Sequence, residues 1–119
     1  MFYKVIEGYS SIVAGYSVSK YRRYGLAVSL IARVGFIDGS ILYIKDYMFL
    51  NGKRKYSYHW QDRDGNLMVR WDNSQHYKDI HTFPHHKHFP DKITESKERN
   101  IRDIFKYIKN SISQNRTDD

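Results

Sequence analysis

The chain has 119 residues, which predicts a single domain over residues 1–119 with one modest hydrophobic core. Hydrophobic residues make up 40% of the chain and aromatic residues 16%, which excludes an intrinsically disordered protein. There is no cysteine, so disulfides, thiolate metal ligands and a cysteine nucleophile are excluded. The net charge of +7 favours an acidic partner: nucleic acid, an acidic protein or an anionic membrane surface.

Three features of the sequence bear on localisation. The first ten residues lack an apolar segment followed by a cleavage site of small residues, so we expect no signal peptide. Ser29 and Arg33 interrupt the longest apolar stretch, so we expect no membrane-spanning helix. The absence of cysteine is compatible with a reducing cytoplasm.

Strand-like segments occupy residues 11–73. Residues 11–24 alternate apolar and polar side chains and predict a first strand that turns near Tyr24-Gly25. The segments 26–37, 40–50, 53–61 and 66–73 are rich in β-branched and aromatic residues, and we predict a strand in each. They are separated by three pairs that are typical of tight two-residue hairpin loops: Asp38-Gly39, Asn51-Gly52 and Asp64-Gly65.

The strand pattern ends at residue 74. Residues 74–93 are polar and contain both prolines and most of the histidines, so they predict a loop of about twenty residues. Residues 94–113 predict a helix with Thr94 as its N-cap. Its apolar stripe has helical spacing and must cover an apolar surface, which the sheet offers: Ile101, Ile104, Phe105, Ile108 and Ile112. We therefore predict an α+β fold, an antiparallel meander of four to five strands with a C-terminal amphipathic helix packed on one face.

Counting outward from two-residue loops predicts which side chains share a face of the sheet. The count places His59 opposite both Arg70 and Ile44. One face is then polar, with apolar residues between its polar ones: Arg33, Asp46, Ser57, His59, Arg70 and Asp72. The other face is mainly aromatic: Val34, Tyr43, Tyr47, Phe49, Tyr56, Tyr58, Trp60, Val69 and Trp71. A three-residue loop with a glycine bulge at any turn would reverse the alternation beyond it.

The segment HTFPHHKHF, residues 81–89, admits more than one kind of chemistry. Imidazole is a good ligand for zinc, nickel and copper, and this segment has enough histidines for three ligands: His81, His85, His86 and His88. It lacks a His-Glu-x-x-His motif and any helical spacing, so we assign no metal ligand and no cofactor. Nucleotide-binding loops and hydrolase elbows are excluded because their glycine motifs are missing.

Histidine also suits acid–base chemistry, because it titrates near neutrality. RNA cleavage without metal needs a base for the 2′-OH, an acid for the leaving oxygen and cations for the phosphorane. If the loop folds back across the polar face, its histidines meet His59 and Arg70. We assign acid–base or phosphate-binding roles in catalysis to four residues: His59, Arg70, His86 and His88. We assign nucleic-acid contacts to four more: Arg33, Lys87, Tyr58 and Asn73. The alternative is a solvated face with cross-strand ion pairs.

Residues 55–88 resemble TumE-type toxins of toxin–antitoxin pairs. The resemblance rests on the string YSYHWQDRDG, a following hydrophobic-Arg-Trp-Asp-Asn segment, and TFPHHKH. With DGSILYIKDY upstream, these strings cover over half of the chain, and the C-terminal helix also fits. The motif falls on these positions: Tyr58, His59, Arg70, Trp71, Asp72, Asn73, His76, Pro84, His85, His86 and His88. Similar proteins often begin with a helix, for which the segment before the first strand looks short here.

The resemblance implies a cytoplasmic toxin that a cognate antitoxin, encoded beside it, neutralises. RNA cleavage is the usual expectation for small basic toxins, so we predict a metal-independent endoribonuclease with RNA and the antitoxin as partners and no membrane partner. Two alternatives stay open: a non-enzymatic module that binds nucleic acid or the antitoxin, and a metal-binding protein built on the histidine loop. Exposed sheet edges are compatible with a homodimer or with strand addition by an antitoxin.

Overall fold

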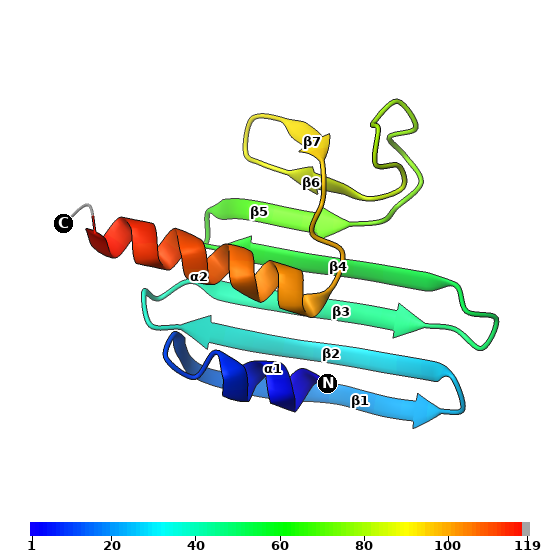
Figure 1. Cartoon of the computed structure of the whole chain (residues 1–119), viewed down its shortest axis with the longest axis horizontal. Coiled ribbons are helices and arrows are strands. Elements are labelled where there is room, and N and C mark those ends of the chain that lie inside the picture. Colours follow the sequence, from blue (N-terminus) through cyan, green and yellow to red (C-terminus); the bar gives the residue numbers. More distant parts are fainter. Residues whose placement is uncertain (118–119) are drawn as a thin grey trace.

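A single antiparallel sheet forms the body of the molecule (Figure 1), as the computed structural model of residues 1–117 shows. The α+β fold with a C-terminal helix is confirmed, but the sheet has seven strands rather than four to five. Each strand lies beside its predecessor in the chain. The strands are β1 (Val13–Tyr24), β2 (Ala27–Phe36), β3 (Ile41–Met48), β4 (Arg54–Gln61), β5 (Leu67–Asp72), β6 (His86–His88) and β7 (Ile93–Glu95).

The two additional strands lie where we predicted other structure. β6 lies within the predicted loop 74–93, and β7 spans the end of that loop and the start of the predicted helix 94–113. β6 pairs with β5, so that His88 lies opposite Arg70 and His86 lies opposite Asp72. β7 in turn pairs with β6. Each has three residues, which is too short for an alternating pattern to stand out from the surrounding polar sequence.

The three Asx-Gly hairpins have three-residue loops, not the two-residue loops that we predicted. The closing backbone hydrogen bonds run from Phe36 N to Ser40 O, from Phe49 N to Lys53 O, and from Asp62 N to Asn66 O. In each loop the last residue is a glycine with positive φ, at +87°, +83° and +86°. A turn followed by a glycine in the left-handed region is the usual form of a three-residue hairpin loop.

This loop length corrects the predicted register at two of the three hairpins. Tyr43, not Ile44, lies opposite His59, and Tyr43 rather than Ile44 also lies opposite Arg33. As a result β3 is turned over: Tyr43 and Tyr47 share a face with His59, whereas Ile44 and Asp46 lie on the aromatic face. The two shifts cancel at β2, so Arg33 is on the face that we predicted. At the third hairpin a bulge beside Gln61 restores the predicted pairs, His59 with Arg70 and Ser57 with Asp72.

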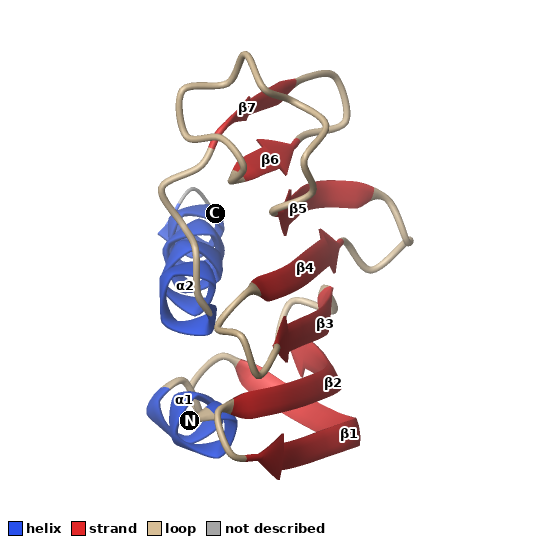
Figure 2. Cartoon of the chain, turned by 90° about the vertical axis from the view of Figure 1, so that its right-hand side faces the viewer, coloured by secondary structure: helices blue, strands red, loops and turns tan. Residues whose placement is uncertain are grey.

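Two helices cover the same face of the sheet, as Figure 2 shows. The short α1 (Phe2–Gly8), which we did not predict, buries Phe2, Val5 and Ile6 against that face. The long α2 (Ile101–Thr117) starts seven residues later than predicted, because Thr94 belongs to β7. Its N-cap is Asn100, whose Oδ1 accepts a hydrogen bond from Asp103 N at 3.0 Å.

The core lies between the two helices and the sheet. The predicted apolar stripe of α2 is buried, and it meets the buried face of strands β2 to β5. Trp60 and Trp71 point into this layer and contact the ring of Tyr107 edge-on. Within residues 1–117, no helix is both long and apolar enough to cross a membrane. The opposite face of the sheet carries no helix, and we call it the open face (Figure 2).

Candidate functional site

The pairing of the strands arranges polar side chains of the open face in rows across the sheet. One row contains His59 of β4, Arg70 of β5 and His88 of β6, because Arg70 lies opposite both histidines. We call these three residues the His59–Arg70–His88 row. The next row contains Ser57, Asp72 and His86. Neighbouring strands are about 4.8 Å apart, so adjacent members of a row are within reach of one another.

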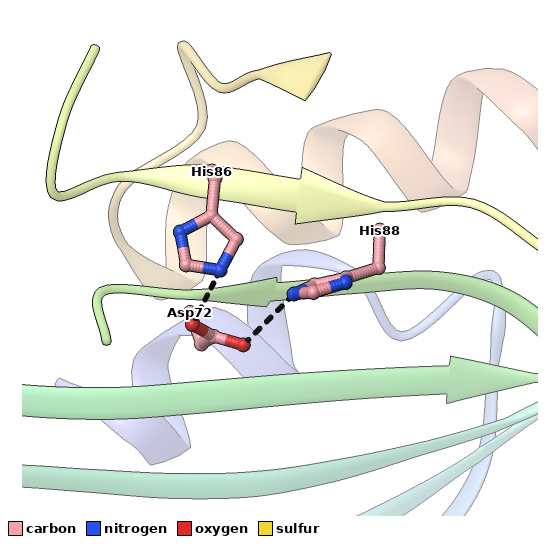
Figure 3. Close-up of side chains that lie close together, drawn as sticks. All are labelled: Asp72, His86 and His88. Carbon is pink, nitrogen blue, oxygen red and sulfur yellow. Dashed lines mark ion pairs between the residues drawn. The ribbon is translucent and has the colours of Figure 1, made fainter. Parts of the chain in front are cut away.

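Asp72 joins the two rows through its carboxylate, which lies between two histidines of β6 (Figure 3). His86 Nε2 is 2.8 Å from Asp72 Oδ1, and His88 Nε2 is 3.4 Å from Oδ2. Arg70 Nε is also 3.4 Å from Oδ2. We call Asp72, His86 and His88 the Asp72 cluster. Its three candidate ligand atoms all lie within 4.8 Å of one another.

His86 is the most enclosed member of the Asp72 cluster, since only 1% of it is exposed. Its Nδ1 is 3.0 Å from the carbonyl oxygen of Pro84, which can only accept a hydrogen bond. The ring of Tyr77 packs edge-on against it, with centroids 4.8 Å apart. Although Nε2 is close to Asp72, it makes no directed hydrogen bond within the described part of the chain.

Burial and neighbouring charges shift several pKa values in the site. Burial raises the pKa of Asp72, but hydrogen bonds from Ser74 and the nearby His86 and His88 outweigh it, so the pKa is lowered overall. Asp72 is therefore an anion at neutral pH. Burial lowers the pKa of His88, and the charge of Asp72 partly opposes this shift. Burial and then the charge of Arg70 lower the pKa of His59.

The open face is strongly basic. Asp72 is the one acidic residue among the described residues that β1 to β5 place on it. The strand pairing puts six cations there: Lys20, Arg22, Arg33, Lys45, Lys55 and Arg70. A hollow of about 480 Å³ opens beside Arg70 and Asp72, and Lys45, Tyr47 and Lys55 form part of its lining. The arrangement can hold an anionic chain, and the histidines of the His59–Arg70–His88 row can exchange protons beside it.

The structure brings four of the residues that we predicted for the site onto the open face: Arg33, His59, Arg70 and His88. His86 joins them through Asp72, but it is buried. Three nucleic-acid candidates lie elsewhere. Tyr58 is fully buried and donates its hydroxyl hydrogen to Asp46, and Lys87 pairs with Glu98 at 3.1 Å on the helix side.

Asn73 is the third candidate that does not serve the open face. Its side chain binds the backbone of β4, accepting a hydrogen bond from Tyr56 N and donating one to Arg54 O. It therefore continues the pairing of β4 beyond the end of β5. Outside the Asp72 cluster, His85 Nδ1 lies 2.8 Å from the hydroxyl of Tyr56, which places that histidine away from the His59–Arg70–His88 row.

Asp72 and Tyr77 contribute to the site although we did not assign them to it. For Asp72 a signal was present, because the strand count placed it on the face of Arg70 and the resemblance covers it. For Tyr77 there was none: it lies in an irregular segment, and its contacts with His86 and His88 depend on how residues 73–85 fold back.

Comparison with known proteins places the chain in a family. The family model described as "Toxin TumE" matches residues 2–112, which is nearly the whole chain. No curated protein and no solved structure gave a match. The matched segment contains both helices' buried residues, all seven strands and every residue of the Asp72 cluster. The chain therefore belongs to the TumE toxin family.

Proposed function

We propose that this toxin cleaves RNA without a metal ion, with the His59–Arg70–His88 row as its catalytic centre and the open face as its RNA-binding surface. The observation that carries the proposal is the placement of two histidines on either side of an arginine, on a basic face. Family membership supports the toxin role and implies an antitoxin partner. Action on RNA in the cytoplasm is our inference from the charge and chemistry of the open face.

The geometry of the row suits cleavage by the 2′-OH. In such a reaction the attacking and leaving oxygens lie on opposite sides of phosphorus, so the base and the acid must flank the phosphate. His59 and His88 are two strands apart, which separates their backbones by about 10 Å. Arg70 lies between them, and its guanidinium can bind a phosphate and stabilise the charge of the transition state.

Asp72 has a positioning role in this proposal. It faces Nε2 of His88, so that nitrogen carries the hydrogen and Nδ1 is the one that exchanges a proton with RNA. It also holds Arg70 through Nε. The buried His86 does not reach the substrate, and it acts through Asp72, whose other oxygen it contacts. His86 thus changes from a catalytic candidate to a positioning residue.

The rest of the open face supplies affinity for RNA. Cations on β1 to β4 can contact phosphates on one side of the scissile bond, and Tyr43 and Tyr47 offer rings for stacking of single-stranded bases. The hollow beside Asp72 can take a neighbouring nucleotide. Arg33 is exposed on this face and belongs to the same surface.

A non-enzymatic RNA-binding toxin is the second candidate. The observation in its favour is that most cations of the open face lie on β1 to β4, outside the His59–Arg70–His88 row. These cations would bind RNA even if the row did not cleave it. The two candidates differ in whether the RNA remains intact when it is bound.

The test is cleavage of single-stranded RNA by purified protein in EDTA. His59→Ala and His88→Ala should each lower the rate by about 10²–10⁴-fold, the contribution of a general acid or base. The products should carry 2′,3′-cyclic phosphates, because the 2′-OH is the nucleophile. His81→Ala, which changes an exposed histidine outside both rows, is the matched control and should keep full activity. Intact RNA together with arrested growth of cells that express the protein would leave the binding candidate instead.

A further inference from the structure

We propose that the Asp72 cluster is a binding site for a divalent transition metal, best suited to Zn²⁺, and that the bound ion inhibits the toxin. The metal site stands on its own geometry, while the inhibition rests on the proposed function. We assigned no metal ligand from the sequence, because the histidine segment lacks a His-Glu-x-x-His motif and helical spacing. The β6 strand and its register against Asp72 became visible only in the structure.

The donor set of the Asp72 cluster is one that zinc prefers. Zinc sites with an open position have three protein ligands, commonly histidine nitrogens and a carboxylate oxygen, and a fourth ligand from solvent. In a tetrahedral site with bonds of about 2.0–2.1 Å, the ligand atoms are roughly 3.3 Å apart. His86 Nε2 is 2.8 Å from Asp72 Oδ1 and His88 Nε2 is 3.4 Å from Oδ2, and with one atom taken from each residue all three ligand atoms lie within 4.8 Å of one another, so small side-chain movements would reach this separation.

A second observation points to a cation in the cluster. The ring of His86 lies between two acceptors, the Pro84 carbonyl oxygen at Nδ1 and the Asp72 carboxylate at Nε2. Because the carbonyl can only accept, Nδ1 is the donor in that contact, and Nε2 is the ring nitrogen that is available to bind a metal ion. Nε2 is fully buried and has no directed partner in the described chain. A metal ion held by both Nε2 and Asp72 would supply the partner that this buried nitrogen lacks.

Neighbouring groups already hold the candidate ligands in the way that metal sites usually require. Metal-binding histidines usually donate their other ring N–H to a backbone carbonyl or a carboxylate, which fixes the ring and the tautomer. The Pro84 carbonyl does this for His86. The backbone N–H of Ser74 holds Asp72 Oδ1 at 3.0 Å, and Tyr77 packs against both histidine rings.

Arg70 opposes metal binding, because its positive charge lies 3.4 Å from Asp72 Oδ2. Its side chain is 41% exposed, so it can turn toward the hollow when a metal arrives. Arg70→Gln should therefore strengthen zinc binding, whereas loss of a true ligand weakens it.

Zinc at the cluster would remove two functions from the proposed catalytic centre. His88 would bind the metal through Nε2, so its hydrogen would reside on Nδ1 and no lone pair would remain to accept a proton from RNA. Asp72 would also release Arg70. The bound ion therefore switches the centre off without covering the basic strands, and RNA binding by β1 to β4 continues.

Binding is tested by titrating Zn²⁺ into the full chain, without a histidine tag and stripped of metal with a chelator. Calorimetry should give one ion per chain and a rise in Tm. Asp72→Asn and His88→Ala should each weaken binding by at least about tenfold, because even mutation of a residue that only supports a zinc ligand lowers the affinity on that scale. His81→Ala should bind as the original chain does, and circular dichroism verifies that each variant is folded.

Two binding results would overturn the site: no stoichiometric zinc, or a loss of zinc in His81→Ala with unchanged binding in folded His88→Ala. The inhibition is tested separately, by adding zinc to the cleavage assay and to an RNA-binding assay. Zinc should stop cleavage while RNA binding persists, and cleavage that zinc stimulates would overturn the inhibition. If the metal-free chain cleaves no RNA, the proposed function fails, and calorimetry still decides the metal site.

Discussion

At the scale of single residues, Asp72 connects the groups of the candidate site. It is largely buried, and its carboxylate contacts Arg70, His86 and His88 at once. A buried anion is costly unless it is paired and hydrogen-bonded, and here the pairing groups are the candidate catalytic residues themselves. Stability and function are therefore coupled at this position, which is why we test it with the conservative change to Asn.

Burial of Tyr56 predicts a specific loss of stability in alkali. Burial raises the pKa of Tyr56 to about 12, above the ordinary value of 10.0. A group with a raised pKa in the folded state contributes stability that is fully present below pH 10 and is lost as the pH rises toward 12. The free energy of unfolding should therefore fall over this range, and fall less steeply in Tyr56→Phe.

Urea unfolding at several pH values from 8 to 12 measures this difference. At pH 8 the variant should be less stable by about 1 kcal/mol, because the hydrogen bond between the Tyr56 hydroxyl and His85 is lost. Parallel curves for the two proteins between pH 10 and 12 would show that the pKa of Tyr56 is the same in the folded and unfolded states, which would contradict the prediction.

At the scale of elements, the hairpin loops determine which side chains reach the open face. An Asx-Gly pair is compatible with loops of two or three residues, and the two lengths differ by one residue in register. That single residue decides whether Tyr43 or Ile44 of β3 faces His59. The sequence predicts where the hairpins are, but the backbone conformation of the loop selects the face.

Gly52 should be the residue that keeps the β3–β4 loop in its three-residue form. Its φ is +83°, and an added Cβ would meet no atom within 4 Å, so the cost of Gly52→Ala comes from the backbone alone. We expect a loss of about 1–2 kcal/mol in the free energy of unfolding, measured by urea denaturation.

Gly8→Ala is the matched control for this change. Gly8 also has free space around its Cα but lies in α1, where alanine is favoured over glycine by roughly 0.5–1 kcal/mol. The two variants should therefore shift stability in opposite directions. A stable Gly52→Ala protein would mean that the loop tolerates another conformation and that glycine does not fix the register.

At the scale of the whole molecule, the two faces of the sheet differ in what they contact: one packs against the helices and the other is open and basic. The helices lie on the covered face, together with the ion pairs of Arg54 with Asp46 and of Lys87 with Glu98. The cations of the open face are left to interact with a polyanion. This separation allows a small chain with a net charge of +7 to fold around one core and still present a continuous basic surface.

The basic face predicts a defined salt dependence of RNA binding. The logarithm of the binding constant for single strands falls with the logarithm of salt concentration by about 0.7 per neutralised phosphate. The double variant Lys45→Gln/Lys55→Gln should bind more weakly and reduce the slope by about 1.4, since it removes two contacts. Filter binding or fluorescence anisotropy at several salt concentrations measures both quantities.

Lys97→Gln/Lys106→Gln is the matched control, because it removes the same charge from the helix side of the molecule. It should leave the slope unchanged. Equal effects of the two double variants would show that RNA responds to net charge alone and not to the open face.

The motifs of the sequence indicated the family. By itself, the sequence also determined the elements with strong local patterns, which are the first five strands and the apolar stripe of α2. These depend on periodicity and turn residues that lie close together in the chain. Only the tertiary structure decided that His86 and His88 form a sixth strand against Asp72, that β3 is turned over, and that Tyr58 is buried. Short strands and loop lengths gain their stability from neighbouring strands and the core, so no local pattern encodes them.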